Sequence, residues 1–237
     1  MAAQQARARV SDERRANRLL LACGVIGPPL FVMVFLVEGA TRPGYSAWRH
    51  YVSQLSLGEG GWMQIANFLL CGLLSLCFAL GLRRTLQGGT GATWGPLLLA
   101  VFGLGLIVAG IFVTDPALGY PSGAPLRPPG LVTHATLHGR VHGLSGLVVF
   151  SSLAAACFVL ARRFAGDPAW RGWAAYSVVT GVLVAVFFVA SLATAPFPGA
   201  PSGLLQRLAI VLGWGWIMLL AARLVWSRDR RSPRGRL

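Results

Sequence analysis

The sequence predicts an all-α protein, a polytopic bundle of six transmembrane helices, and two observations lead to this fold class. The first is composition: 55% of the 237 residues are hydrophobic, only 12% are charged, and the mean hydropathy is +0.63. This balance exceeds that of an ordinary soluble domain. The second is run length, because a helix needs about 20 predominantly apolar residues to cross the hydrocarbon layer. Six such runs occur, at 19–39, 62–82, 95–114, 142–161, 173–195 and 205–225.

The distribution of arginine predicts the orientation of these helices. The chain has no lysine, and its arginines gather before the first run, after the second, between the fourth and fifth, and after the sixth. These segments share one side of the membrane and leave five arginines for the other: Arg42, Arg49, Arg127, Arg140 and Arg207. Since basic residues stay on the cytoplasmic side, we expect both termini in the cytoplasm and the protein in the plasma membrane.

These bounds also predict the domain organisation. A basic N-terminal segment (1–18) precedes the transmembrane domain (19–226), and a basic tail (227–237) follows it. The formal net charge of +14 is spread over short membrane-flanking segments and is not gathered on a folded domain with interleaved aromatic residues, as nucleic-acid binding would favour. We therefore expect contact with the lipid bilayer and its anionic headgroups, and no nucleic-acid partner.

The first long loop on the arginine-poor side carries a helical pattern near 46–57. Apolar residues recur there at i, i+3, i+4 and i+7, at Trp48, Tyr51, Val52 and Leu55. This spacing predicts a short interfacial helix. Its apolar stripe would lie on lipid or on the bundle, and its opposite face would turn Arg49, His50, Ser53 and Gln54 toward the second long loop. A simple aromatic anchor among the lipid headgroups is the alternative interpretation.

Histidine supplies the most specific chemical pattern. His134, His138 and His142 stand four residues apart, so neighbouring members share a helix face, whereas the first and third would lie about 12 Å apart. One ion can therefore bind only two neighbouring histidines of the three. We predict that these are His138 and His142, because they lie nearest the apolar run. Catalytic zinc usually has three protein ligands and one water. Asp115 and His50, expected on the same side, are the candidates that complete a zinc site.

Zinc-bound water and a polarised carbonyl would indicate hydrolysis. In that hypothesis Glu38 is a candidate general base, Ser53 orients substrate or water, and Asp115 contributes to catalysis. Structural alternatives stand beside each assignment. Glu38 can pair with Arg42 four residues later, Asp115 before Pro116 can begin a turn, and histidines at an interfacial helix start can be half solvated.

Several of these segments resemble one known family. The stretches Arg42-Pro-Gly-Tyr, Phe112-Val-Thr-Asp-Pro and His138-Gly-Arg-Val-His-Gly are similar to the bacterial multi-helix membrane family known as domain of unknown function 998. The resemblance extends from about Leu19 to Trp226 and implies six helices, but no activity.

A weaker similarity is to the alkaline ceramidases and adiponectin-receptor-like proteins. Their seven-helix bundles hold a zinc ion with three histidines near an aspartate and a serine, which here would correspond to His138, His142, Asp115 and Ser53. The chain departs from that pattern in helix number, and its paired histidines begin a helix of the middle of the chain.

Two function classes follow. One is a metal-dependent membrane hydrolase that acts on a lipid-like substrate at a site facing outward. The other is a non-enzymatic protein that binds or transports a small lipophilic or ionic ligand, or supports a membrane partner, with the histidines as a pH-sensitive polar cluster.

Overall fold

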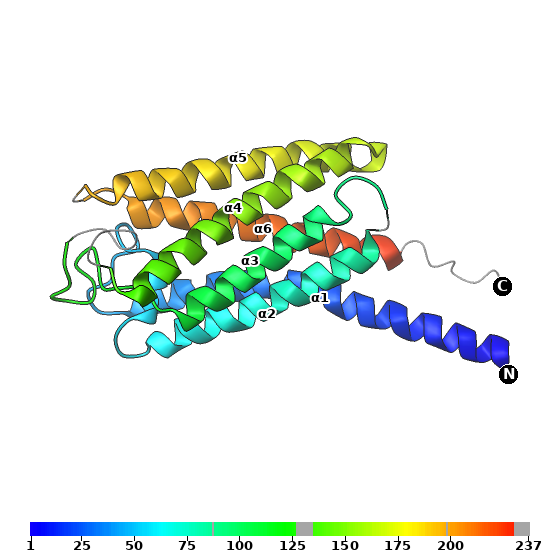
Figure 1. Cartoon of the computed structure of the whole chain (residues 1–237), viewed down its shortest axis with the longest axis horizontal. Helices are drawn as coiled ribbons and strands as arrows, with labels where there is room; N and C mark the ends of the chain where they lie inside the picture. Colours follow the sequence, from blue (N-terminus) through cyan, green and yellow to red (C-terminus); the bar gives the residue numbers. More distant parts are fainter. Residues whose placement is uncertain (87, 127–134, 198, 230–237) are drawn as a thin grey trace.

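Six long helices form most of the molecule and confirm the predicted fold class (Figure 1). The computed structural model describes residues 1–86, 88–126, 135–197 and 199–229. The helices are α1 (Ala2–Thr41), α2 (Gly61–Thr85), α3 (Trp94–Ile111), α4 (Leu137–Ala165), α5 (Arg171–Thr194) and α6 (Ser202–Asp229). Two short 3-10 helices, η1 (Val52–Ser56) and η2 (Pro168–Trp170), lie in the connections. All six long helices are apolar enough to span a membrane.

Helices α1 and α4 differ most from the predicted runs and begin well before them. Helix α1 starts at Ala2 because the sequence has no glycine or proline before Gly24 to interrupt it, and its first turns project beyond the bundle (Figure 1). Helix α4 starts at Leu137 because Thr136 caps it: the Thr136 hydroxyl accepts a hydrogen bond from the Gly139 N–H at 3.0 Å. A side chain of this kind satisfies one of the free amides of a first turn.

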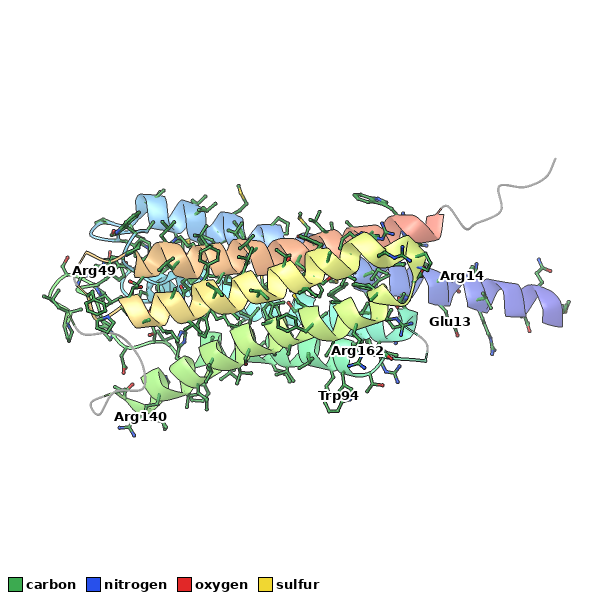
Figure 2. All side chains as sticks on the ribbon, turned by 90° about the horizontal axis from the view of Figure 1, so that it is seen from above. Glu13, Arg14, Arg49, Trp94, Arg140 and Arg162 are labelled. Carbon is green, nitrogen blue, oxygen red and sulfur yellow. The ribbon has the colours of Figure 1, made fainter. Side chains whose placement is uncertain are left out.

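The helices form a closed ring in chain order, in which each packs on its neighbours and α6 packs on α1. The start of α1 and the end of α6 lie at the same end of the bundle (Figure 1). We call this the terminal end; it also carries the α2–α3 and α4–α5 connections. The opposite loop end carries the other three connections. Figure 2 shows Arg14, Arg162 and Trp94 toward the terminal end, and Arg49 and Arg140 at the loop end.

Small residues let neighbouring helices approach closely, as is common in membrane bundles. Between α2 and α3, a Cβ placed on Gly72 would lie 2.7 Å from the Gly103 carbonyl oxygen, and one on Gly103 would lie 2.8 Å from that of Gly72. Neither position tolerates a larger side chain without separating the helices.

The segment near 46–57 differs from the predicted interfacial helix. Its helical part is the shorter η1, and all five residues of η1 are buried. The reason is that its polar side chains have partners inside the protein: Gln54 accepts from the Tyr51 N–H at 2.9 Å and donates to the Ala117 carbonyl oxygen at 2.6 Å. The segment therefore lies across the mouth of the bundle and not on the lipid surface.

Candidate functional site

One aromatic side chain from each of the six helices meets at the centre of the bundle. The contacting rings have centroids 4.1 to 6.1 Å apart. We call this group the aromatic cluster; it consists of Phe31, Phe68, Phe102, Phe150, Phe188 and Trp214. All six side chains are buried, so the axis of the ring is filled with packed rings and is not a pore.

A cavity of about 50 Å³ lies between the aromatic cluster and η1. Its walls are mostly apolar, and they include Leu106, Ala109, Val149 and Ile210. Three polar side chains also line it, and they come from three separate elements: Ser53 of η1, His142 of α4 and Gln206 of α6. A water molecule needs about 10–15 Å³ of such volume, so this loop-end cavity has room for about three or four.

The protonation of His142 follows from its hydrogen bonds. Nδ1 lies 3.1 Å from the Ala109 carbonyl oxygen and 2.9 Å from that of Phe112. Because carbonyl oxygens only accept, Nδ1 carries the proton and neutral His142 has its lone pair on Nε2. Nε2 has no hydrogen-bond partner among residues 1–86, 88–126, 135–197 and 199–229. The histidine therefore offers one acceptor of fixed orientation at the cavity.

Ser53 and Gln206 offer donors at the same cavity. The Gln206 side-chain oxygen accepts from the Val52 N–H at 2.8 Å, which fixes the orientation of the amide. Its NH₂ group and the Ser53 hydroxyl make no hydrogen bond within the described part of the chain. Polar groups this deep in a protein normally have a partner, so the cavity is arranged to receive molecules that form hydrogen bonds.

Two arginines hold the segment that covers the cavity. Arg42 donates to Glu38 at 2.9 Å and to the carbonyl oxygens of Leu55 and Leu57 at 3.1 and 3.0 Å. The pairing of Glu38 with Arg42, the alternative considered for Glu38, is thereby confirmed. Both side chains are buried, and the second Glu38 oxygen, Oε2, is buried without a partner in the described residues.

The second arginine that holds the covering segment is Arg207 of α6. It is 7% exposed, and its Nη1 donates to the carbonyl oxygens of Ala47 and His50, both at 2.8 Å. Its Nη2 donates to the Tyr45 hydroxyl, and the guanidinium lies 5.4 Å from the Tyr45 ring centroid. Planar, multiply donating recognition of this kind is specific to arginine. Arg207 thus joins α6 to the turn that precedes η1.

His50 is one of the predicted ligands, and both of its ring nitrogens bind backbone. Nδ1 accepts from the Ser46 N–H at 2.9 Å, and Nε2 lies 3.1 Å from the Leu118 carbonyl oxygen, to which it donates. Burial lowers the pKa of His50 below its ordinary value, against the opposing effect of the Leu118 hydrogen bond. Burial likewise raises the pKa of Tyr45 to about 12, although Arg207 acts in the other direction. His50 is therefore a neutral structural group.

Asp115 caps the start of α4. Its two oxygens accept from the N–H and the hydroxyl of Thr136 at 2.9 and 2.6 Å. A Cβ on Gly139 would lie only 2.1 Å from the Asp115 Oδ2, so the glycine makes room for the carboxylate. His138 is exposed and lies against Phe112, with ring centroids 5.2 Å apart. His134 lies outside the described residues.

The structure thus brings two predicted site residues, Ser53 and His142, to one cavity and holds Glu38, His50 and Asp115 in separate contacts. The described residues contain no group of three or more His, Cys, Asp or Glu side chains placed to hold a metal ion. Of the residues predicted as zinc ligands, His50 binds backbone, Asp115 binds Thr136, His138 is exposed and His142 lines the cavity; a zinc ion shared by them stays a prediction.

Sequence reasoning missed Arg207 and Gln206, which contact residues more than 150 positions away in the chain. The available signal was that an arginine and a glutamine stand together at the start of an apolar run, where a polar side chain is costly unless it has a partner.

The chain is, from its six apolar helices, a multi-pass membrane protein. It belongs to the family described as protein of unknown function (DUF998), which matches residues 25–223. The resemblance noted in the sequence is confirmed. No curated protein and no solved structure matches the chain.

Proposed function

We propose that this protein binds a small ligand with an apolar body and one hydrogen-bonding group in the loop-end cavity. The observation that carries the proposal is the pairing of apolar walls with three polar groups that have no partner among the described residues: the Ser53 hydroxyl, the His142 Nε2 and the Gln206 NH₂ group. A few convergent polar groups in an apolar pocket are typical of ligand sites.

The size of the cavity limits the ligand. Pockets for drug-sized ligands have volumes of about 300–1,000 Å³, whereas this one has about 50 Å³. It fits a short alcohol or the end of an aliphatic chain, and not a whole lipid. Because the aromatic cluster fills the bundle axis beneath the cavity, binding is favoured over passage through the ring in this conformation.

The test is photolabelling of the purified protein with a short aliphatic alcohol that carries a diazirine, followed by peptide mapping. Gly146 lines the cavity, and a Cβ there meets nothing within 4 Å, so a side chain can begin at this position without a clash and Gly146→Leu is the variant chosen to block the cavity. Thermal unfolding like that of the parent checks that it folds. We expect labelling of the Ser53 and His142 peptides in the parent and its loss in Gly146→Leu.

Gly215→Leu is the matched control, because Gly215 is also open in α6 but does not line the cavity. The Ser53 and His142 peptides of Gly215→Leu should be labelled to the same extent as those of the parent. Equal labelling of all three proteins would refute a ligand site and leave ordered water as the occupant of the cavity.

A second candidate is hydrolysis. The observation that favours it is that Ser53, a hydroxyl nucleophile, shares the cavity with the His142 Nε2 lone pair, which can accept a proton. This pairing of nucleophile and base activates serine in many enzymes. A lipophilic fluorophosphonate should then label the parent and Ser152→Ala, which removes another buried serine of α4, but not Ser53→Ala. Absence of labelling in the parent would exclude the serine mechanism.

We also propose that the loop end faces away from the cytoplasm of the cell and that the protein lies in the plasma membrane, because arginine is concentrated at the terminal end. A membrane-impermeant maleimide on intact cells should label Glu59→Cys, which is exposed at the loop end, and not Glu13→Cys, which is exposed near the terminal end. The reverse pattern would invert the orientation.

A further inference from the structure

A second cavity, of about 600 Å³, lies at the terminal end. It is bounded by the α2–α3 connection, by the end of α4 with the α4–α5 connection, and by α6. Its volume falls in the range of ligand pockets. The loop-end cavity is far smaller and lies on the other side of the aromatic cluster, so the two are separate features.

Charge distinguishes this terminal cavity. Arg162 and Arg163 line it, and the only acid in its described lining is Asp167. Asp167 is already engaged, because its Oδ1 accepts from the Ala169 N–H at 2.9 Å. The described lining therefore holds two arginines and one carboxylate, and its formal charge is positive.

The two arginines have different roles. The Nη1 of Arg163 donates to the carbonyl oxygens of Gly88 and Thr90 at 2.8 and 3.1 Å, so Arg163 holds the α2–α3 connection in place. Arg162 is exposed and forms no hydrogen bond or ion pair with any of the described residues. Its whole guanidinium is available to a ligand.

A third arginine stands behind the cavity wall. Arg223 stacks on Trp170, with its guanidinium carbon 4.2 Å from the ring centroid, and its Nη2 donates to the Ala169 carbonyl oxygen at 2.7 Å. Its Nε is buried and has no acceptor among the described residues. Trp170 itself lines the cavity. An unpaired buried cationic donor adds to the positive potential there.

Leu82, Phe164 and Leu220 form an apolar part of the remaining wall, and Thr85 and Thr90 also line the cavity. The combination of an apolar floor with a planar, bidentate cation matches a phosphate group, since arginine pairs with phosphate through two parallel hydrogen bonds. We propose that the terminal cavity binds the phosphate group of an anionic ligand, with Arg162 as the principal contact. Two sources share this chemistry, an anionic phospholipid headgroup and free inorganic phosphate.

The test is equilibrium binding to the purified full chain in a neutral detergent, with two probes: a soluble short-chain phosphatidylglycerol and inorganic phosphate. The variant is Arg162→Gln. The matched control is Arg84→Gln, because Arg84 is also exposed near the terminal end and loses the same charge, but does not line the cavity. Unchanged thermal unfolding of both variants confirms that they fold.

We expect Arg162→Gln to weaken binding about tenfold or more, since it removes a charge-assisted hydrogen bond, and Arg84→Gln to bind like the parent. Binding of phosphatidylglycerol alone with this variant dependence supports a lipid headgroup, and binding of inorganic phosphate with the same dependence supports free phosphate. Failure of both probes to bind, or equal weakening in the two variants, would overturn the proposal.

Discussion

Replacement of Gly203 by alanine tests the contact between α6 and the turn before η1. A Cβ at this position would lie 2.4 Å from the His50 carbonyl oxygen and 2.9 Å from that of Ala47. Ordinary contact begins at 3.4 Å, so the turn must move by about 1 Å. That shift would lengthen the 2.8 Å bond from Arg207 to the His50 carbonyl oxygen beyond hydrogen-bonding distance.

The expected cost has two parts. Overpacking costs about 1–3 kcal/mol, and a lost hydrogen bond to a charged group about 1.5 kcal/mol, for a total of about 2.5–4.5 kcal/mol. In a protein of this size 1 kcal/mol corresponds to about 2–4 °C in Tm, so Gly203→Ala should lower Tm by about 10 °C. The assay is thermal unfolding in detergent, monitored by a thiol-reactive fluorophore that reports exposure of the buried Cys71 and Cys157.

Gly215→Ala is the control, because a Cβ at Gly215 meets nothing within 4 Å and alanine favours the helix. Its Tm should equal or slightly exceed that of the parent. If Gly203→Ala matches Gly215→Ala within about 2 °C, the turn is not held against α6 as described, and the inferred role of Arg207 fails with it.

The other predictions use the same unfolding assay or metal analysis. The lowered pKa of His50 means that the unfolded chain binds a proton more readily, so Tm should fall as pH decreases below about 6.5; His50→Gln should reduce this dependence and His138→Gln should not. Asp115→Asn should cost about 1 kcal/mol by weakening the cap of α4, seen as a Tm about 2–4 °C lower, whereas Glu59→Gln should match the parent. The described residues contain no third ligand beside His138 and His142, so neither His138→Ala nor His142→Ala should change the zinc content of the purified protein. If the parent holds one zinc per chain and both variants lose it, the predicted zinc site is supported instead.

The sequence predicted the helices well because the bilayer imposes a simple requirement of length and apolarity on each of them. The helix boundaries were harder to predict, because the starts of α1 and α4 depend on local features outside the apolar runs. Thr136 is an example, because a capping role depends on where the backbone turns and a threonine in a loop does not reveal it.

The site was predicted only in part. His142 was chosen for its position near the apolar run, and it does line a cavity, but the spacing of the histidines could not show that His138 would be exposed and His142 buried. His50 resembled a ligand because its backbone partners, at Ser46 and Leu118, come from turns that carry no periodic pattern. The role of Gln206 could not be predicted, because it depends on a hydrogen bond from Val52, which lies far away in the chain.

Helix α6 links the two cavities, because Gln206, Ile210 and Trp214 line one and Leu220 and Leu224 line the other. A displacement of this single helix along its axis would alter both volumes together. If occupancy of one cavity displaced α6, affinity at the other cavity would change, and by reciprocity each ligand would alter the binding of its counterpart by the same factor. Such coupling between the two sides of the bilayer would need no continuous channel.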